Sequence, residues 1–521
     1  MELLKKNINM SRNKQKMTTQ ISENEDVNLP DYMPDIEKIV QETGEVIPER
    51  IEAMQGKILI KGMLKYNLLY VGEDSYGHIS AFIRETPFEE EIHMQSAEEH
   101  DDVQLDISQE KFEINIINSR KINVKMIIEL DITVSENVSE SMAVDVEDDA
   151  DIQKKFRDRE ILQLKNAGND IFRFHDTEAL PKDKPNIEEL IYQSIEPREM
   201  ELRCDEGYIS IDGRIHVFVL YTPEEQSKLP QWVEYEFPVQ GKVECNESEP
   251  GMIGDLQWNL YKKELEVKED SENEPRILSI DGVIEVSMKI YEEENIRQLE
   301  DVYATDKVLM PVSRPVLLSK LLMKNNSVCK LVKRMKVSED SFRVLQICNI
   351  EGTVKPEKIT PEGDILSTEG HVFVKMLYVT DDEAQPFRVA KGVLPFSHNV
   401  EVMNLNDKCS YRIRPLIESI SANMADLNEI EIHVQIAMDV LVFDCDQMNI
   451  IDEIGENEMS KDEIRNMPGM VGYIAGEGET LWDIAKRYFT TVDDLKNINK
   501  LSDEEIGAGQ KILITKKMAR L

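Results

Sequence analysis

Long stretches of the chain alternate between apolar and polar residues. From Ile122 to Val134 every second residue is apolar, and similar alternation returns over residues 280–290 and 430–442. Neighbouring side chains of a β-strand point to opposite faces, so a period of two predicts strands with one face on a core and the other in water. Strands of this kind are typical of antiparallel sheets. The pattern therefore predicts a fold that is mainly β.

Three segments of the chain align with one another as an internal repeat. They start at Lys57, Tyr208 and Asp364, and in each of them a tyrosine follows a glycine by eight residues. The pairs are Gly62 with Tyr70, Gly213 with Tyr221, and Gly370 with Tyr378. Successive copies are about 150 residues apart, which is an ordinary size for one domain. We therefore expect three homologous β-rich domains.

A short stretch that contains prolines is associated with each copy. These stretches begin at Leu29, Leu180 and Met310, and apolar residues at helical spacing follow the prolines. Proline is favoured in the first turn of a helix, so we expect a short helix leading into each sheet. The predicted architecture is three repeated antiparallel β-rich domains with short helices, followed by a small C-terminal domain.

The last part of the chain has the pattern of a strand–helix–helix–strand (βααβ) domain. Thr480 can cap a first helix, with Asp483 three residues later in the reciprocal position of a capping box. Thr491 gives a second helix start of the same kind, and residues 511–515 form an apolar closing strand. The domain contains no cysteine, so its small core has to suffice without a disulfide.

These patterns divide the chain into six regions. The segments between them are acidic and polar, and the tether before the C-terminal domain ends in Pro468 and Gly469, which favours flexibility. A short helix over residues 450–454 of the tether would be marginal on its own. We expect a flexible N-terminal tail over residues 1–24, repeats over 25–140, 141–300 (with an acidic lead-in) and 301–446, an acidic linker over 447–471, and the C-terminal domain over 472–516.

The chain is strongly acidic, with 102 Asp and Glu against 61 Lys and Arg and a net charge of −41 at pH 7. An excess of this size repels nucleic acid backbones and anionic membrane surfaces, so we expect neither as a partner. No apolar stretch reaches the length of a membrane span, and the N-terminus lacks the apolar core of a signal peptide. We therefore expect no membrane insertion and a protein that is made, and works, in a cytoplasm.

The sequence shows no catalytic or metal-binding pattern. The six cysteines are scattered, without a CxxC pair or a histidine at ligand spacing, which favours inert thiols over zinc sites or disulfides. The phosphate-binding Gly-x-x-x-x-Gly-Lys-Ser/Thr loop, the Gly-x-Ser-x-Gly elbow and the His-Glu-x-x-His motif are all missing. We expect a protein that is not an enzyme, needs no cofactor and binds no metal.

The C-terminal domain resembles the LysM family, whose pattern is an aromatic strand, a Gly-Asp-Thr-Leu-Trp-x-Ile-Ala helix start, a second helix with a Leu and an Asn, and a Pro-Gly-Gln turn. The matching residues are Tyr473, Gly478, Thr480, Leu481, Trp482, Ile484, Ala485, Leu495, Asn499, Gly509, Gln510 and Ile512. In that family the loop before the first helix and the loop after the second form a shallow groove for glycans that contain N-acetylglucosamine. The resemblance implies a groove lined by Gly478, Glu479, Thr480, Leu481, Gly509 and Gln510. The sequence departs on the rim, where Glu477 and Ala508 replace prolines of the family.

The threefold repeat resembles the SPOCS domains of endospore-forming bacteria, which occur in spore coat assembly proteins, often in series ahead of a C-terminal LysM domain. The resemblance covers most of residues 25–445. It implies a protein of the mother-cell cytoplasm that works at the forespore surface and in the spore coat. It also implies a main partner, the coat-morphogenetic ATPase of stage IV sporulation, with other coat proteins as further partners.

Two functions remain open after these resemblances. The first is a non-enzymatic adaptor that binds the ATPase through its LysM domain and promotes encasement of the forespore by the coat. For that interface we expect Ile474 and Trp482 as anchors, with Lys486 and Arg487 at the rim. The alternative role of Trp482 is a core residue under the first helix. The second function is binding of peptidoglycan, or another glycan that contains N-acetylglucosamine, through the LysM groove.

Overall fold

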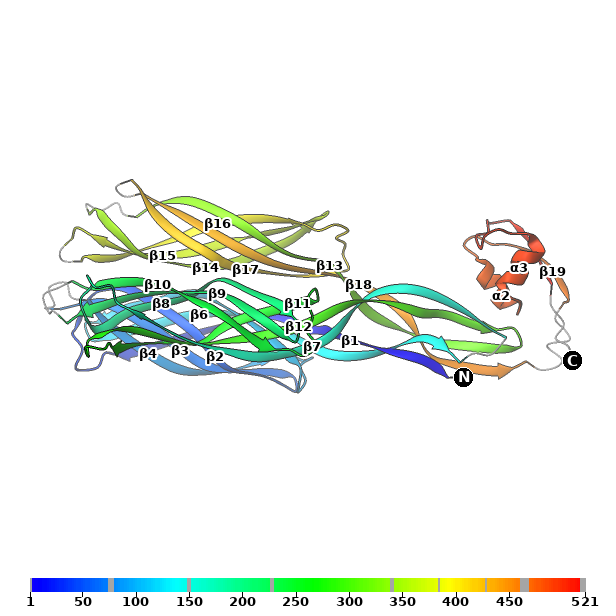
Figure 1. The fold of residues 1–521 in the computed structure, drawn as a ribbon, viewed down its shortest axis with the longest axis horizontal. Coiled ribbons are helices and arrows are strands. Elements are labelled where there is room, and N and C mark those ends of the chain that lie inside the picture. The colour runs from blue at the N-terminus through cyan, green and yellow to red at the C-terminus, as the bar shows by residue number, and fades with distance from the viewer. Residues whose placement is uncertain are drawn as a thin grey trace.

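The computed structural model describes residues 2–73, 79–147, 151–224, 229–337, 342–382, 385–426, 429–459 and 468–515. Within these residues the chain forms three six-stranded units, one after another, and a small C-terminal domain (Figure 1). The predicted fold, mainly β with repeated antiparallel sheets, is confirmed.

Each unit consists of two three-stranded antiparallel sheets, as unit 1 illustrates. β2, β3 and β4 form a consecutive meander, whereas β1 and β5 lie on either side of β6 in the second sheet. The first and last strands of the unit are therefore paired with each other. The strands are β1 (Leu3–Asn28), β2 (Ile36–Met54), β3 (Lys57–Gly72), β4 (Ile79–His93), β5 (Asp102–Asn118) and β6 (Lys121–Val146).

Units 2 and 3 repeat this topology strand for strand. Their meanders have the orders β8-β9-β10 and β14-β15-β16, and their second sheets have the orders β7-β12-β11 and β13-β18-β17. Unit 2 contains β7 (Ile152–Ala179), β8 (Ile187–Asp205), β9 (Tyr208–Pro223), β10 (Gln231–Glu244), β11 (Ile253–Glu269) and β12 (Pro275–Ala304). Unit 3 contains β13 (Lys307–Lys336), β14 (Val344–Glu362), β15 (Ile365–Thr380), β16 (Phe387–Glu401), β17 (Cys409–Asp426) and β18 (Glu429–Glu458).

The alternating apolar residues form a core between the two sheets of each unit. In unit 1, Ile58 and Ile60 of β3 share one buried cluster with Ile128 and Leu130 of β6. Full burial of such side chains contributes about 1.5–3 kcal/mol each. The prediction of half-buried strands from the period of two is therefore confirmed.

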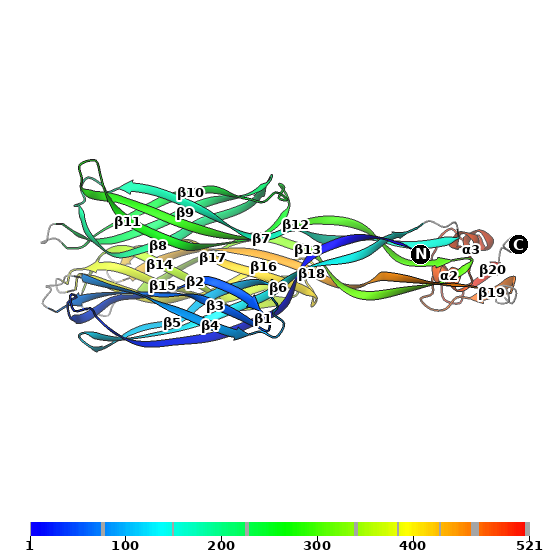
Figure 2. The ribbon, with the colours of Figure 1, turned by 90° about the horizontal axis from the view of Figure 1, so that it is seen from below.

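The three units also share an apolar cluster, which we call the hub. Equivalent strands of each unit contribute equivalent residues to it: Val40, Ile191 and Cys348 from β2, β8 and β14, and Leu69, Leu220 and Leu377 from β3, β9 and β15. The sandwiches accordingly lie side by side around the long axis of the molecule (Figures 1 and 2). The arrangement is a pseudo-threefold one within a single chain.

The first and last strands of every unit run on beyond the sandwiches and together form a stalk (Figure 2). These six strands have 26–30 residues, whereas the other strands of the units have 14–19. Their inward-facing side chains fill the stalk with apolar clusters. Members of these clusters are Val146, Ile152, Leu299, Val302, Leu309 and Ile451.

Two segments that the sequence predicts to be flexible belong to the long strands. Residues 3–24 of the expected N-terminal tail belong to β1, and residues 447–458 of the expected linker belong to β18. Both segments pair along their length, β1 with β6 and β18 with β13, so their backbone groups are satisfied within a sheet. The same pairing replaces the helix expected over residues 450–454 with strand. The units accordingly span 3–146, 152–304 and 307–458, and residues 460–467 of the expected linker lie outside the described residues.

The helices expected to lead into each sheet are replaced by loops and strands. Residues 29–35 form a loop, and β2 begins at Ile36. Residues 180–186 form the equivalent loop of unit 2, and the stretch from Met310 lies inside β13. The helix prediction is wrong because pairing with the neighbouring strands outweighs a weak local preference.

The repeated tyrosine explains how these loops are held. The Tyr70 hydroxyl donates a hydrogen bond to the carbonyl oxygen of Pro34 at 3.0 Å, and Tyr221 donates to that of Pro185 at 3.1 Å. Each tyrosine is buried at the end of its strand. The prolines therefore belong to a tyrosine-fastened turn before the sheet.

The C-terminal domain lies at the far end of the stalk (Figure 1). Its elements are β19 (Met470–Ile474), α2 (Leu481–Arg487), α3 (Val492–Asn499) and β20 (Lys511–Thr515). β19 and β20 pair antiparallel, which confirms the predicted βααβ order. In the part of the chain that the structure describes, no helix has the length and apolar character needed to cross a bilayer.

Candidate functional site

The first helix of the C-terminal domain starts with the predicted capping box. The Asp483 backbone N–H donates to Thr480 Oγ1 at 3.3 Å, and the Thr480 backbone N–H donates to the Asp483 carboxylate at 2.9 Å. Leu481, Ile484 and Ala485 are buried beneath the helix. One face of α2 therefore forms the core, and the residues between these positions face outward.

The second helix is fastened to the closing strand by one side chain. The Asn499 amide donates to the carbonyl oxygens of Leu495 (2.9 Å) and Leu513 (2.8 Å), and its Oδ1 accepts the Leu513 backbone N–H at 2.7 Å. Thr491 caps the start of α3 by accepting the Asp494 backbone N–H at 3.0 Å. The Thr491 cap confirms the predicted start of this helix, and the hydrogen bonds of Asn499 add a fastening to β20 that the sequence did not predict.

Five of the six residues of the expected glycan groove lie in two neighbouring loops, and Leu481 is the first residue of α2. Gly478 and Gly509 have φ angles of 76° and 83°, a region that glycine adopts without strain. Leu481 is a core residue, and Thr480 is committed to the capping box. The backbone N–H of Gly509 donates to the carbonyl oxygen of Ala475 at 2.8 Å, which ties the second loop to the end of β19.

The polar side chains of this groove serve the domain's own structure. Glu479 accepts hydrogen bonds from the Gly476 backbone N–H (2.9 Å) and the Tyr473 hydroxyl (2.7 Å), and it pairs with Arg487 at 2.9 Å. The Gly476 N–H, followed by the Tyr473 hydroxyl, lowers the pKa of Glu479 below its ordinary value. Gln510 Oε1 accepts the Gly507 backbone N–H at 2.9 Å.

The structure separates the four expected partner-binding residues into two pairs. Ile474 and Arg487 are exposed, with 63% of the Ile474 residue surface and 51% of the Arg487 side chain accessible. The Arg487 guanidinium also lies over the ring of Tyr473, 5.6 Å from its centroid. Trp482 and Lys486 point instead toward the stalk.

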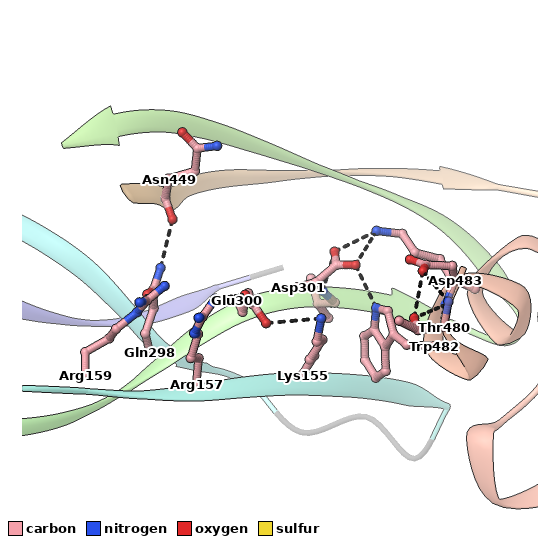
Figure 3. Close-up of polar contacts among 12 residues, drawn as sticks. Lys155, Arg157, Arg159, Gln298, Glu300, Asp301, Asn449, Thr480, Trp482 and Asp483 are labelled. Carbon is pink, nitrogen blue, oxygen red and sulfur yellow. Dashed lines mark hydrogen bonds and ion pairs between the residues drawn. The ribbon is translucent and has the colours of Figure 1, made fainter. Parts of the chain in front are cut away.

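Trp482 and Lys486 converge on one carboxylate of the stalk, Asp301. Figure 3 shows the indole of Trp482 beside this carboxylate. The indole Nε1–H donates to Asp301 Oδ2 at 2.8 Å, and Lys486 Nζ lies 2.6 Å from Oδ1 and 2.8 Å from Oδ2. Hydrogen bonds between charged groups are the stronger ones in proteins. The outward face of α2 is therefore occupied from within the same chain.

Tyr303, two residues further along β12, completes this contact. Its ring packs edge-on against Trp482, with centroids 4.8 Å apart and planes at 73°, and its hydroxyl donates to the carbonyl oxygen of Thr490 at 2.9 Å. Only 3% of Tyr303 is exposed, and it belongs to the core cluster of the C-terminal domain. Burial, together with the charge of Asp301, raises the pKa of Tyr303 well above its ordinary value.

Asp301 and Tyr303 are the functional residues that the sequence did not reveal. They are separated from Trp482 by about 180 positions, and they sit within an ordinary alternating strand. A β-bulge at Glu300 precedes Asp301, and equivalent bulges occur at Val144 and Asp452 in the last strands of units 1 and 3. A bulge re-aims the side chains that follow it.

The possible metal ligands and the cysteines give no second candidate site in the part of the chain that the structure describes. Among the described residues, no cluster of three or more His, Cys, Asp or Glu side chains could hold a metal ion. The six cysteines are free thiols, and burial raises the pKa of the Cys348 thiol to about 12. A thiol with such a pKa is not reactive near neutral pH.

Fold and site together define a class of protein: a pseudo-threefold β-repeat body with a small recognition-type domain docked at the end of its stalk. Comparison with protein families finds the same three repeats and the same C-terminal domain. The family described as "SipL, SPOCS domain" matches residues 35–117, 186–268 and 343–425, and the LysM domain family matches residues 473–515. The chain is a SipL-like protein, with three SPOCS domains followed by a LysM domain.

The SPOCS matches have a simple structural meaning. Each match runs from the start of the meander to the strand before the last, as from β2 to β5 in unit 1. The six long strands that build the stalk lie outside the matches. No curated protein and no solved structure matches the chain.

Proposed function

We propose that this protein is a non-enzymatic adaptor that binds the coat-morphogenetic ATPase of stage IV sporulation through its LysM domain. Its domains are those of a sporulation protein related to the spore coat. In this role it promotes encasement of the forespore from the mother-cell cytoplasm, and other coat proteins are further partners. SPOCS and LysM are domain families without catalytic activity, which agrees with an adaptor.

The observation that carries the proposal is how the LysM domain uses its side chains. The polar groups of the expected glycan groove, above all Glu479 and Gln510, are engaged in internal hydrogen bonds. An apolar patch is exposed instead on the outer face of the two-stranded sheet, where Met470, Ile474 and Leu513 lie together. Exposed apolar side chains that lie together on one face are typical of protein interfaces.

The proposal is tested by measuring binding of the full chain to the purified ATPase and, in parallel, to soluble peptidoglycan fragments. We expect binding to the ATPase, and we expect Ile474→Arg to weaken it at least about tenfold, as for an interface anchor. Val393→Arg, at an exposed apolar position of unit 3, is the matched control and should bind like the wild type. Binding to the glycan fragments alone would reject the adaptor and establish a wall-directed protein.

A further inference from the structure

Three consecutive residues of β12 divide their side chains between the stalk and the LysM domain. Val302 is fully buried in the stalk core, whereas Asp301 and Tyr303 on either side of it contact the LysM domain. Alternate residues of an extended strand point to opposite faces, so one short strand segment places both side chains on α2. The contact therefore needs only an extended Asp-x-Tyr sequence.

Each of these two side chains meets a group that complements it. The Asp301 carboxylate accepts the Trp482 indole N–H and pairs with the Lys486 ammonium. The Tyr303 ring packs on the same indole, and its hydroxyl has its own acceptor in the Thr490 carbonyl. Two side-chain anchors at strand spacing, each with a specific counterpart, are the usual means by which domains recognise extended peptides.

The pseudo-threefold stalk shows that this pairing is specific to unit 2. The residues that follow the three equivalent bulges are all acidic: Asp145, Asp301 and Glu453. The residues two positions later are Glu147, Tyr303 and Gly455. An acidic residue thus recurs in all three units. Only in unit 2 does an aromatic residue follow it two positions later, and the LysM domain lies on that unit.

We propose that the α2 face of the LysM domain is a binding site for an extended acidic–aromatic segment of a partner protein, with a carboxylate and an aromatic ring two residues apart. Residues 301–303 occupy this site from within the chain and are displaced when the partner binds. A segment of the same chain has a high effective concentration, so it keeps the site filled in the free protein. The identity of the partner rests on the proposed function, whereas the site rests on the contacts of β12.

The test uses the full chain and a fluorescein-labelled peptide with the sequence of residues 299–305, Leu-Glu-Asp-Val-Tyr-Ala-Thr. The double variant Asp301→Asn/Tyr303→Ala empties the site, and fluorescence anisotropy measures peptide binding to it. We expect the double variant to bind the peptide at least about tenfold more tightly than the wild type does. Glu300→Gln, which changes the neighbouring carboxylate that pairs with Lys155 and Arg157, is the matched control and should behave as the wild type.

A second peptide, with alanine in place of its Asp and Tyr, should not bind to any of the chains. Equal affinity of all chains for the first peptide, or no binding to the double variant at millimolar peptide, would overturn the proposal. Far-UV circular dichroism checks the fold, and Asp301→Asn alone replaces the double variant if that variant unfolds. Binding of the ATPase to the chain is measured separately. If the peptide binds to the double variant but the ATPase does not bind, the site stands and the ATPase is rejected as the partner. If the ATPase binds but the peptide does not, the proposed site is rejected.

Discussion

A buried carboxylate makes the junction of units 2 and 3 sensitive to pH. Glu196 of β8 lies in a buried setting beside Glu351 of β14, and only 27% of its side chain is exposed. Burial, and then the charge of Glu351, raise the pKa of Glu196 to about 7 from an ordinary 4.5, against the opposing charge of Arg198. The Glu351 carboxylate is itself held by hydrogen bonds from Tyr192 and Asn349.

The sign of the effect follows from the direction of this shift. Between the unfolded pKa near 4.5 and the folded pKa of about 7, the folded protein binds more protons than the unfolded chain. The free energy of unfolding therefore falls as pH rises through this window, and it stays low above it. One pKa unit corresponds to about 1.4 kcal/mol, so the full shift is about 3 kcal/mol. The exposed quarter of the Glu196 side chain makes this an upper limit.

Glu196→Gln removes the charge that causes the penalty. At pH 8 we expect the variant to be more stable than the wild type by about 1–3 kcal/mol, and at pH 4.5 we expect the difference to shrink to a few tenths. Urea unfolding followed by circular dichroism at several pH values gives these differences from the shifts in midpoint. Glu201→Gln is the control, because Glu201 is an exposed residue of the same strand that pairs with Arg203.

The reasoning would be refuted by a stability difference for Glu196→Gln that does not change with pH. A variant less stable than the wild type at pH 8 would refute it as well. Such a result would mean that the ion pair with Arg198, whose nitrogen lies 3.5 Å from the Glu196 carboxylate, outweighs the cost of burial.

Three further perturbations test other parts of the structure. Leu220→Ala removes a fully buried side chain from the hub and should lower the free energy of unfolding by about 2–5 kcal/mol in urea titrations. The same change at the exposed Leu513 should cost little, and equal losses at the two positions would contradict the packing of Leu220 in the hub. Gly370→Ala places a Cβ 2.2 Å from the backbone oxygen of Lys355, so we expect a loss of about 1–3 kcal/mol and a lower melting temperature by calorimetry; an unchanged melting temperature would speak against this close approach. Thr480→Ala removes the cap of α2 and should destabilise the LysM domain by about 1 kcal/mol. We expect faster amide hydrogen exchange in α2 alone, and an equal increase of exchange across the whole chain would contradict a local role of the cap.

The strands of the sandwiches could be predicted because their signal is local. A buried strand such as β6 alternates without a break from Ile122 to Val134, and burial on one face requires that pattern. The caps of α2 and α3 were equally visible, since each lies within four residues of its partner. Where one residue and its neighbours decide the structure, the sequence is sufficient.

The stalk and the docking contact could not be predicted because their causes are distant in the chain. Residues 3–24 are largely polar, and they form β1 only because β6, more than 100 positions away, supplies a pairing edge. For Trp482 the sequence indicates either a partner anchor or a core residue of its own domain. The structure adds a contact that neither role predicts, because the indole meets Asp301 and Tyr303 of unit 2. No local pattern marks either residue for this role.

The stalk tip also shows how a repeated body can acquire a single docking position. Three equivalent bulges present three acidic residues, so charge alone would offer the LysM domain more than one place to dock. In unit 1 that residue, Asp145, is already paired with Lys154 at 2.8 Å. In unit 2, Tyr303 adds an aromatic surface that Trp482 can cover. An aromatic pair contributes about 0.5–1.5 kcal/mol beyond its buried area, which corresponds to a preference of about two- to tenfold for one position. The orientation of the LysM domain therefore depends on the position two residues after the acidic one, where only unit 2 carries an aromatic ring.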